Sequence, residues 1–469
     1  MNYTGCYVLA VTVILILLGG VVMLTGLRLT NFKSWDDTGR VRLAPLTIFF
    51  GRNSSGKSSL IQSLLLMMQT AESLDPRQVL QLGGRETYAD LGTYLDLVKD
   101  HDGHRDVGMT FSWQTREPVR LRRASASSDT LDTDVFRFFT NIAQESGVLG
   151  ELIVQRMEYA IGPGGDRTVG MRHRGDELYE VTSRGLNLRR RAKAPDYLPE
   201  PIKCYGFPDA ASAVFQNADF LAELSHQFDE LMSSISYVGP LRGRPRRRYQ
   251  WQGSSPTFVG PRGENTVAAI LAARRLNRTI KARGFEENLG YWLKHMGLIE
   301  QFAVVEIGSG TNLYELRVSV AGSSTSVSIT DVGFGISQVL PVLVQVFYST
   351  PGTPVILEQP EIHLHPAAQS GLGDVLLGAV KDNGTQLIVE THSEHLLHRI
   401  QRRIAEEEIS KDDVALYFID VEDGRSEIHE LKVDEYGNIT NWPQDFFGDE
   451  MADLAAMTEA AAERRDRHS

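Results

Sequence analysis

The sequence predicts an α/β fold in which a mixed β-sheet carries a phosphate-binding loop. Gly51–Ser58 reads Gly-Arg-Asn-Ser-Ser-Gly-Lys-Ser and matches the pattern G-x-x-x-x-G-K-[ST]. The apolar run Leu46–Phe50 before it has strand character, and Leu60–Met68 after it has helical periodicity. Two further short runs, Pro354–Leu357 and Leu387–Val389, are typical of buried strands and end in polar side chains. Strand, loop and helix therefore follow in the order that phosphate binding requires.

Composition sets the broad class of the protein. The chain has 469 residues, enough for two or three domains or for one large domain with insertions. Its net charge of −12 argues against coating nucleic acid over the whole surface, although a local basic patch is compatible with it. The only two cysteines, Cys6 and Cys204, are far apart in sequence. A disulfide framework and a cysteine zinc site are therefore excluded, and a reducing compartment is favoured.

The first residues have two interpretations. Residues 1–27 carry no charge, and residues 7–24 are nearly all apolar, which is long enough for one membrane-spanning helix. Arg28 and Lys33 follow it and would place the rest of the chain in the cytoplasm, anchored to the inner membrane. Alternatively, the domain starts at Met23 and the residues before it are an over-extended start. Both interpretations stay open.

The phosphate loop, Gly51–Ser58, predicts the chemistry of its ligand. Glycines let the backbone wrap round a polyphosphate, and the following helix directs its positive end at the same anion. Lys57 is expected to reach the β- and γ-phosphates, and the Ser58 hydroxyl to bind magnesium. ATP and Mg²⁺ are the predicted cofactors. The nucleotide-contacting residues predicted here are Gly51, Asn53, Ser54, Ser55, Gly56, Lys57, Ser58 and Ser59.

The middle of the chain predicts an inserted α+β region. Val107–Trp113, Val119–Arg123 and Leu152–Ile161 have strand character, and Ala213–Ser234 has the apolar spacing of one amphipathic helix. The arginine segment, Arg242–Arg248, follows and holds five arginines in seven residues. It is a candidate grip for phosphates of nucleotide or DNA, or else a solvated loop whose arginines pair with acids of the same chain.

The second half of the chain adds a possible second anion site. Gly333–Gln338, here called the glycine–serine turn, precedes an apolar helix start. Backbone N–H groups and a hydroxyl at a helix N-terminus can hold an anion. The residues predicted to do so are Gly333, Gly335, Ser337 and Gln338.

Two strand ends then supply polar groups. The run Pro354–Leu357 leads into Glu358-Gln359-Pro360-Glu361, here called the acidic turn. Glu358 stands where a phosphate-loop ATPase places a second magnesium contact, so Ser58 and Glu358 are the predicted metal ligands. After Leu387–Val389, His392 is expected to hydrogen-bond the γ-phosphate or to position water.

Together these features resemble ABC-type ATPases of the branch that includes SMC, RecF and OLD-type proteins. Glu358–Pro366 and Glu390–Leu397 look like one group of bacterial and archaeal AAA-type ATPases, and Gly437–Phe447 is similar to the closing motif of that group's small C-terminal domain. The resemblance covers about residues 23–450. It implies an α/β P-loop NTPase fold of ABC-ATPase-like architecture, with a mixed β-sheet, an inserted α+β region and a small C-terminal α+β appendix.

The resemblance also implies a homodimer of two subunits packed head to tail. Each ATP then lies between the phosphate loop of one subunit and the Gly333–Gln338 turn of the other. ATP binding would close the dimer and hydrolysis would open it, driving a partner effector protein or a DNA transaction, in phage defence or DNA maintenance. The alternative is a nucleotide-dependent structural scaffold with little turnover, membrane-anchored if residues 7–24 form a span.

One residue departs from the pattern of this family. ABC-type enzymes usually have a glutamate directly after the acidic metal ligand, and this chain has Gln359 there. An amide cannot accept a proton as a carboxylate does, so Gln359 is limited to orienting water. Glu361 is the predicted general base, unless it only shapes the turn. The candidate catalytic residues are Glu361, Gln359 and His392.

The chain is predicted to divide into five parts. These are a membrane helix or over-extended start (1–26), the first part of the ATPase domain (27–115), the inserted region (116–300), the second part of the ATPase domain (301–420) and a C-terminal domain with its tail (421–469). The stretch after His392 is too short for the Toprim nuclease domain of OLD-type proteins. A hairpin turn is expected at Val421–Ser426, and a helix over 451–469.

Overall fold

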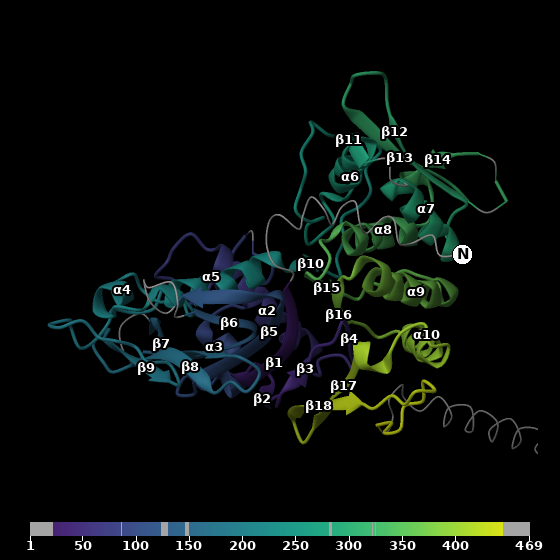
Figure 1. Ribbon diagram of the computed structural model, residues 1–469. Helices are drawn as coiled ribbons and strands as arrows, with labels where there is room; N and C mark the ends of the chain where they lie inside the picture. Colours follow the sequence, from purple (N-terminus) through teal and green to yellow (C-terminus); the bar gives the residue numbers. More distant parts are fainter. Residues whose placement is uncertain are drawn as a thin grey trace, which may run out of the picture.

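The computed structural model describes residues 22–85, 87–122, 130–145, 150–280, 284–320, 322–323 and 325–443. Two β-sheets lie side by side, with a smaller sheet and two helices above them (Figure 1). Most of the predicted membrane span, the predicted helix over 451–469 and the end of the closing motif lie outside the described residues.

The central sheet is the part of the fold that carries the site. Its strand order is β10 (Ser236–Val238), β15 (Pro354–Glu358), β16 (Gln386–Glu390), β4 (Leu46–Gly51), β17 (Val414–Glu422) and β18 (Arg425–Leu431). The first five strands are parallel and β18 is antiparallel, so the sheet is mixed, as the sequence predicted. Because the parallel strands end at one edge, the residues after β4, β15 and β16 lie close together.

Alternation along β4 explains how both faces of this sheet are buried. Leu46, Ile48 and Phe50 pack into one apolar core, and Phe49 packs into the other. Helices α8 (Phe334–Tyr348), α9 (Pro366–Asn383) and α10 (Glu394–Ala405) cover the first face (Figure 1). Helix α2 (Lys57–Glu72) covers the second, where it lies between the central sheet and the antiparallel sheet.

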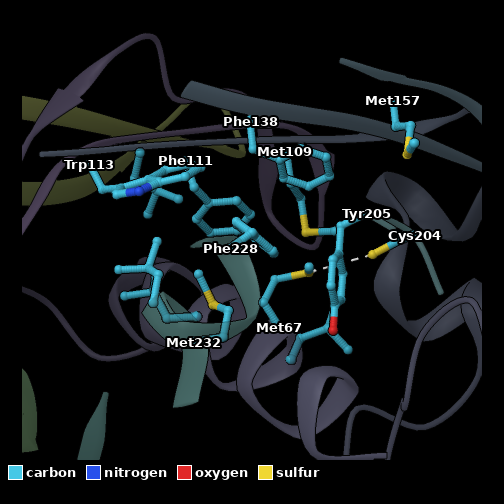
Figure 2. Close-up of a cluster of buried hydrophobic side chains, with 14 of the residues drawn as sticks. Met67, Met109, Phe111, Trp113, Phe138, Met157, Cys204, Tyr205, Phe228 and Met232 are labelled. Carbon is cyan, nitrogen blue, oxygen red and sulfur yellow. Dashed lines mark hydrogen bonds between the residues drawn. The ribbon is translucent and has the colours of Figure 1, made fainter. Parts of the chain in front are cut away.

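The antiparallel sheet pairs strands from the start of the chain with the inserted region. Its order is β2 (Trp35–Asp37), β1 (Val22–Phe32), β5 (Val107–Arg122), β6 (Thr130–Gln144), β7 (Leu152–Ile161), β8 (Arg167–His173) and β9 (Tyr179–Arg184), and β3 (Val41–Arg42) also pairs with β1. Helix α5 (Asp219–Ser234) packs on it through Phe228, whose ring lies 4.5 Å from Phe138 and 5.8 Å from Trp113 between centroids (Figure 2). Met67 of α2 joins the same core and contacts Cys204, which is a buried free thiol (Figure 2).

The third group of elements packs over α8. It contains α6 (Thr266–Ile280), α7 (Phe285–His295) and a small sheet of β11 (Tyr249–Gln250), β13 (Leu313–Ser319), β12 (Gln301–Glu306) and β14 (Val327–Ser328). Within the described residues, the remaining short helices are α3 (Tyr94–Leu97), α4 (Ala210–Val214) and the 3₁₀ turns η1 (Lys99–His101), η3 (Ile329–Asp331) and η4 (Lys411–Asp413).

The structure corrects two predicted elements. The predicted strands Val107–Trp113 and Val119–Arg123 form one strand, β5, whose register shifts between Gln114 and Val119. The predicted helix Ala213–Ser234 is broken, because α4 ends at Val214 and α5 begins at Asp219. Between them the Asn217 side chain bonds the N–H of Arg189 and the carbonyl of Asn187, which ties the chain to a neighbouring loop.

The boundaries of the N-terminal part also change. Val22–Leu24 of the predicted apolar span belong to strand β1, not to a helix, and Leu24 exchanges two hydrogen bonds with the Gln386 side chain. No helix within the described residues is long and apolar enough to cross a bilayer. The division between residues 115 and 116 falls inside β5, and the division between 420 and 421 falls inside β17.

The hairpin predicted near the C-terminus is present. Strands β17 and β18 pair as an antiparallel hairpin, and its turn at Asp423 and Gly424 has positive φ angles of 48° and 77°. Since β17 also pairs with β4, this C-terminal segment completes the central sheet instead of forming a separate body.

Candidate nucleotide site

The phosphate loop needs its glycines for two local reasons. Gly51 and Gly56 have φ angles of 145° and 105°, which L side chains rarely adopt. A Cβ at Gly51 would also lie 2.0 Å from the carbonyl oxygen of Ile419 in β17, and a Cβ at Gly56 would lie 2.8 Å from the Ser426 hydroxyl. The C-terminal hairpin of β17 and β18 therefore packs directly against the loop, and only glycine fits at these two positions.

Polar contacts hold the same loop from the inside. The Lys57 ammonium donates to the carbonyls of Gly51 at 3.0 Å and Arg52 at 2.5 Å, and Trp35 Nε1 donates to the Gly56 carbonyl at 3.2 Å. Burial lowers the pKa of Lys57, and the Glu390 carboxylate opposes this shift. The ammonium thus lies inside the loop, where a polyphosphate would meet it.

The other predicted residues of the loop divide by exposure. Asn53 and Ser54 are exposed at its tip, whereas Ser55 and Ser59 are buried. The Ser55 hydroxyl has no hydrogen-bond partner among the described residues. A buried polar atom of this kind usually has a partner, so its position suits a ligand oxygen.

Strand register brings two carboxylates to the loop. Glu358 at the end of β15 lies opposite Glu390 of β16, and Glu390 lies opposite Phe49 of β4. The Ser58 hydroxyl donates to Glu390 Oε1 at 3.0 Å. Glu390 was not among the site residues predicted from the sequence. The signal was its place at the end of a strand, but pairing of β16 between β15 and β4 cannot be read from one strand alone.

The charges at this edge repel one another. Burial raises the pKa of Glu358 to about 7, and Glu390 adds to the shift, whereas a hydrogen bond from Tyr237 and the charge of Arg242 oppose it. Burial likewise raises the pKa values of Glu361 and Glu390. Carboxylates crowded in this way favour either protonation or a bound cation.

The donor atoms fit magnesium. Glu361 Oε2 and Glu390 Oε2 are buried and lack a hydrogen-bond partner in the described part of the chain. The Ser58 hydroxyl, Glu358 and Glu390 offer oxygen atoms, which is the ligand type that Mg²⁺ prefers.

The three candidate catalytic residues meet at one cavity. It has a volume of about 500 Å³ and is lined by Asn53, Gln359, Glu361, Ile362, His363, Gln369 and His392. The backbone N–H of His392 donates to Glu361 Oε1 at 2.9 Å, which connects the ends of β15 and β16. Burial lowers the pKa of His392, and the Lys57 ammonium adds to the shift, so the neutral imidazole is favoured.

Gln359 has an unusual backbone. Its φ angle is 44°, in the left-handed region that residues other than glycine rarely occupy. Its N–H donates to the Glu390 carbonyl at 2.8 Å, and its own carbonyl accepts from Ile362 at 3.2 Å. The acidic turn is therefore held in a strained conformation that faces the cavity.

The glycine–serine turn lies next to the cavity without lining it, since the Phe334 ring packs on His363 with 5.1 Å between ring centroids. Gly333 precedes α8 and is exposed, and Phe334 beside it is 45% exposed. Gly335 packs closely on the turn after β15, since a Cβ there would lie 2.7 Å from the His363 carbonyl. Among the described residues that line the cavity, none belongs to this turn.

The two polar side chains of the turn bond within the chain. The Ser337 hydroxyl donates to the Phe334 carbonyl at 2.7 Å, and Gln338 Nε2 donates to the Gly243 carbonyl at 3.4 Å. Within one chain, the four residues predicted here are thus gathered at the start of α8 but are not brought to the phosphate loop.

The arginine segment is divided by the structure. Arg242 is only 7% exposed and donates to main-chain carbonyls of the acidic turn, so it is neither an exposed phosphate grip nor part of a solvated loop. Arg247 pairs with Asp331 at 2.6 Å, as the alternative interpretation of the segment expected. Arg244, Arg246 and Arg248 are exposed.

Two family models match parts of the chain. Residues 272–397 match a model described as an AAA ATPase domain, and residues 409–457 match one described as a protein of unknown function (DUF3696). The first match contains the glycine–serine turn, the acidic turn and His392, and the second contains β17 and β18. These matches confirm the predicted resemblance to AAA-type ATPases that end in a C-terminal region of unknown role. A comparison with curated proteins found no match.

Solved structures of SMC head domains are similar at low identity. One, an SMC head bound to the C-winged helix domain of ScpA, has a TM-score of 0.45 and 12% identity over 87% of this chain and 98% of that chain. An SMC head with an extended coiled coil, bound to a ScpA domain from Pyrococcus furiosus, has a TM-score of 0.45 and 11% identity over 88% and 96%. The Thermotoga maritima SMC head has a TM-score of 0.35 and 12% identity over 88% and 100%. The strand order and the phosphate loop, rather than these scores, establish the α/β P-loop fold.

Proposed function

We propose that this chain is a magnesium-dependent ATPase that works as a nucleotide-gated homodimer. The observation that carries the proposal is a convergence at one edge of the central sheet. There the Lys57 ammonium lies inside the phosphate loop, Ser58 bonds Glu390, and Glu361 and His392 line the adjoining cavity. An ATPase of this type needs a phosphate cradle, a metal site and a base within reach of one another.

The phosphate loop binds the triphosphate in this proposal. Its N–H groups and the N-terminus of α2 face the anion, and Lys57 exchanges its bonds to the Gly51 and Arg52 carbonyls for the β- and γ-phosphates. Ser58, Glu358 and Glu390 would hold Mg²⁺, which when bound neutralises charge on the phosphates.

Glu361 acts as the general base. Its Oε1 accepts the His392 N–H, so Oε2 is the atom free to take a proton. The water oxygen forms a bond to the γ-phosphorus, the bond from that phosphorus to the β–γ bridging oxygen breaks, and the water proton passes to Glu361. The Gln359 amide orients the water and the His392 imidazole contacts the γ-phosphate.

The second copy supplies the other side of the nucleotide. The exposed start of α8 at Gly333 presents a positive helix end, which suits a γ-phosphate held by a neighbouring subunit. Closure on ATP and opening after hydrolysis would then drive a partner effector or a DNA transaction. The exposed Arg244, Arg246 and Arg248 support DNA as the molecule on which the dimer acts.

A second candidate function is a nucleotide-dependent scaffold with little turnover. The specific observation that favours it is Gln359, an amide at the position where related enzymes carry their base. In this candidate ATP joins two copies, and an effector protein performs the chemistry.

One experiment separates the two functions. Phosphate release by the purified protein with Mg²⁺ and ATP is compared with release by Lys57→Ala. Turnover that depends on Lys57 supports the ATPase. ATP-dependent dimerisation of the wild type without Lys57-dependent turnover supports the scaffold and contradicts the ATPase.

A further inference from the structure

Arg242 is a buried cation with unused hydrogen-bonding capacity. Its side chain is 7% exposed, and its Nη2 donates to the carbonyls of Glu358 at 2.9 Å and Gln359 at 3.2 Å. Its Nε and Nη1 are buried and have no partner among the described residues. Burying a guanidinium is costly unless its charge and its N–H groups are used, so this arginine needs an explanation beyond packing.

The groups that face Arg242 are those of the proposed hydrolysis site. Glu361 is the acid that interacts with it most strongly, followed by Tyr237 and Glu358. Glu361 Oε2 is itself buried without a partner in the described part of the chain. The charge of Arg242 therefore acts on the carboxylate that lines the cavity, and both groups have buried atoms without a hydrogen-bond partner among the described residues.

The bonds of Arg242 also fix the backbone of the acidic turn. The N–H of Gln359 is held by the Glu390 carbonyl, and its carbonyl is held by both Ile362 and Arg242. Both ends of this residue are therefore pinned while its φ angle stays at 44°. The left-handed region is unfavourable for an amino acid other than glycine, and the Arg242 bonds help to offset that cost.

We propose that Arg242 is a positioning residue for ATP hydrolysis, a role that rests on the proposed function. It holds the acidic turn so that Gln359 and Glu361 face the cavity, and its positive charge lies beside the carboxylate that takes the proton. Arg242 is not among the described residues that line the cavity, so it acts through Glu361 and Gln359. Its removal is expected to slow the chemical step and to leave ATP binding intact.

The test compares Arg242→Gln and Arg242→Lys with a matched control, Arg274→Gln. Arg274 also donates to a main-chain carbonyl, that of Val304 at 2.7 Å, but it lies on α6 away from the cavity. For each variant, kcat is measured from phosphate release, ATP affinity from a fluorescent ATP analogue, and folding from the melting temperature.

Arg242→Gln is expected to lower kcat by about 30-fold or more, with ATP affinity within about threefold of the wild type. Arg242→Lys keeps the charge and a donor nitrogen but not the planar guanidinium, so part of the lost kcat returns. Arg274→Gln keeps the wild-type kcat. The proposal is overturned if Arg242→Gln keeps kcat within about threefold, or if affinity and kcat fall together in proportion to the loss of folded protein.

The wild type in the same assay distinguishes failure of the ATPase from failure of the role of Arg242. If it shows no Lys57-dependent turnover, the ATPase function fails, and the role of Arg242 fails with it. If the wild type hydrolyses ATP and Arg242→Gln is equally fast, only the role of Arg242 fails.

Discussion

The phosphate loop and the glycine–serine turn are both anion-binding motifs at helix N-termini, yet the fold treats them differently. The loop is enclosed by Trp35, by the carbonyl of Ile419 in β17 and by its own Lys57. The turn lies at the exposed start of α8, beside the 45% exposed Phe334. One motif is completed within the chain, and the other is left facing outward.

This contrast indicates that one chain completes the phosphate loop but does not complete the site at the glycine–serine turn. Hydrogen bonds and packing hold the enclosed loop, so the loop can be ready for ATP before ATP arrives. The exposed turn presents the positive end of a helix. A second copy that brings the phosphates held by its loop to this turn would place an anion there, which is the arrangement that we propose.

The variant with the largest expected effect tests the enclosed phosphate loop. Lys57→Ala removes the ammonium that lies inside the loop, so phosphate release is expected to fall by about 100-fold or more. The measurement is steady-state phosphate release with Mg²⁺. Chelating Mg²⁺ with EDTA in the wild type should cause a similar loss, and turnover that persists in EDTA would contradict the metal site.

Glu361→Gln separates ATP binding at the phosphate loop from the chemical step of hydrolysis. Without a base, single-turnover hydrolysis is expected to fall by about 100-fold. ATP binding should persist, so the dimer should accumulate in ATP and be visible by light scattering. Wild-type rates in this variant would assign Glu361 to the shape of the turn instead.

Gly51→Ala tests how tightly the C-terminal hairpin holds the loop. The new Cβ would lie 2.0 Å from the Ile419 carbonyl at a φ angle of 145°. The free energy of unfolding, measured with denaturant, is expected to fall by roughly 2–4 kcal/mol. The control is Gly39→Ala, where φ is 62° and nothing lies within 4 Å of the added Cβ. An equal cost at both positions would show that the hairpin does not constrain the loop.

The raised pKa of Glu358 predicts that the stability of the fold depends on pH. The pKa of Glu358 is raised to about 7 in the folded chain, above its usual value of 4.5. The folded state therefore holds this proton more tightly than the unfolded chain does. Without metal, the stability from this group is fully present below pH 4.5 and falls as pH rises through 7, by about 3 kcal/mol.

Denaturant unfolding between pH 5 and pH 8 measures this loss. The raised pKa values of Glu361 and Glu390 act in the same direction, so Glu358→Gln should flatten the pH profile only in part. An unchanged profile in Glu358→Gln would contradict the role given to its carboxylate.

The smallest expected effect concerns the exposed arginines. Replacing Arg244, Arg246 and Arg248 with alanine should leave ATP turnover within about twofold, because these side chains lie outside the cavity. If the dimer acts on DNA, DNA binding should weaken by several-fold, and the slope of its salt dependence should decrease by about one for each phosphate that is no longer neutralised. Fluorescence anisotropy with a DNA duplex at several salt concentrations measures both, and unchanged DNA binding would exclude these residues.

Local patterns predicted most of what positions the site. The strand, loop and helix around Lys57 and the β17–β18 hairpin were readable because each is set by neighbours in sequence. Glu390 was missed because its place depends on β16 pairing between two other strands. Arg242 was misread because a run of arginines gives no sign of which member folds inward. The break in the predicted helix at Asn217 depends on hydrogen bonds with a loop that lies earlier in the sequence.

Mixing two inactive variants tests directly whether each chain supplies one half of a shared site. Lys57→Ala damages the phosphate loop, and Gly333→Arg places a bulky cation at the exposed glycine–serine turn, where nothing lies within 4 Å of an added Cβ. Mixed dimers would contain one intact site, formed by the undamaged loop of one subunit and the undamaged turn of the other. We predict that the equimolar mixture recovers about a quarter of wild-type phosphate release, because about half of the dimers are mixed and each has one site. A mixture as inactive as its two components would contradict the shared site.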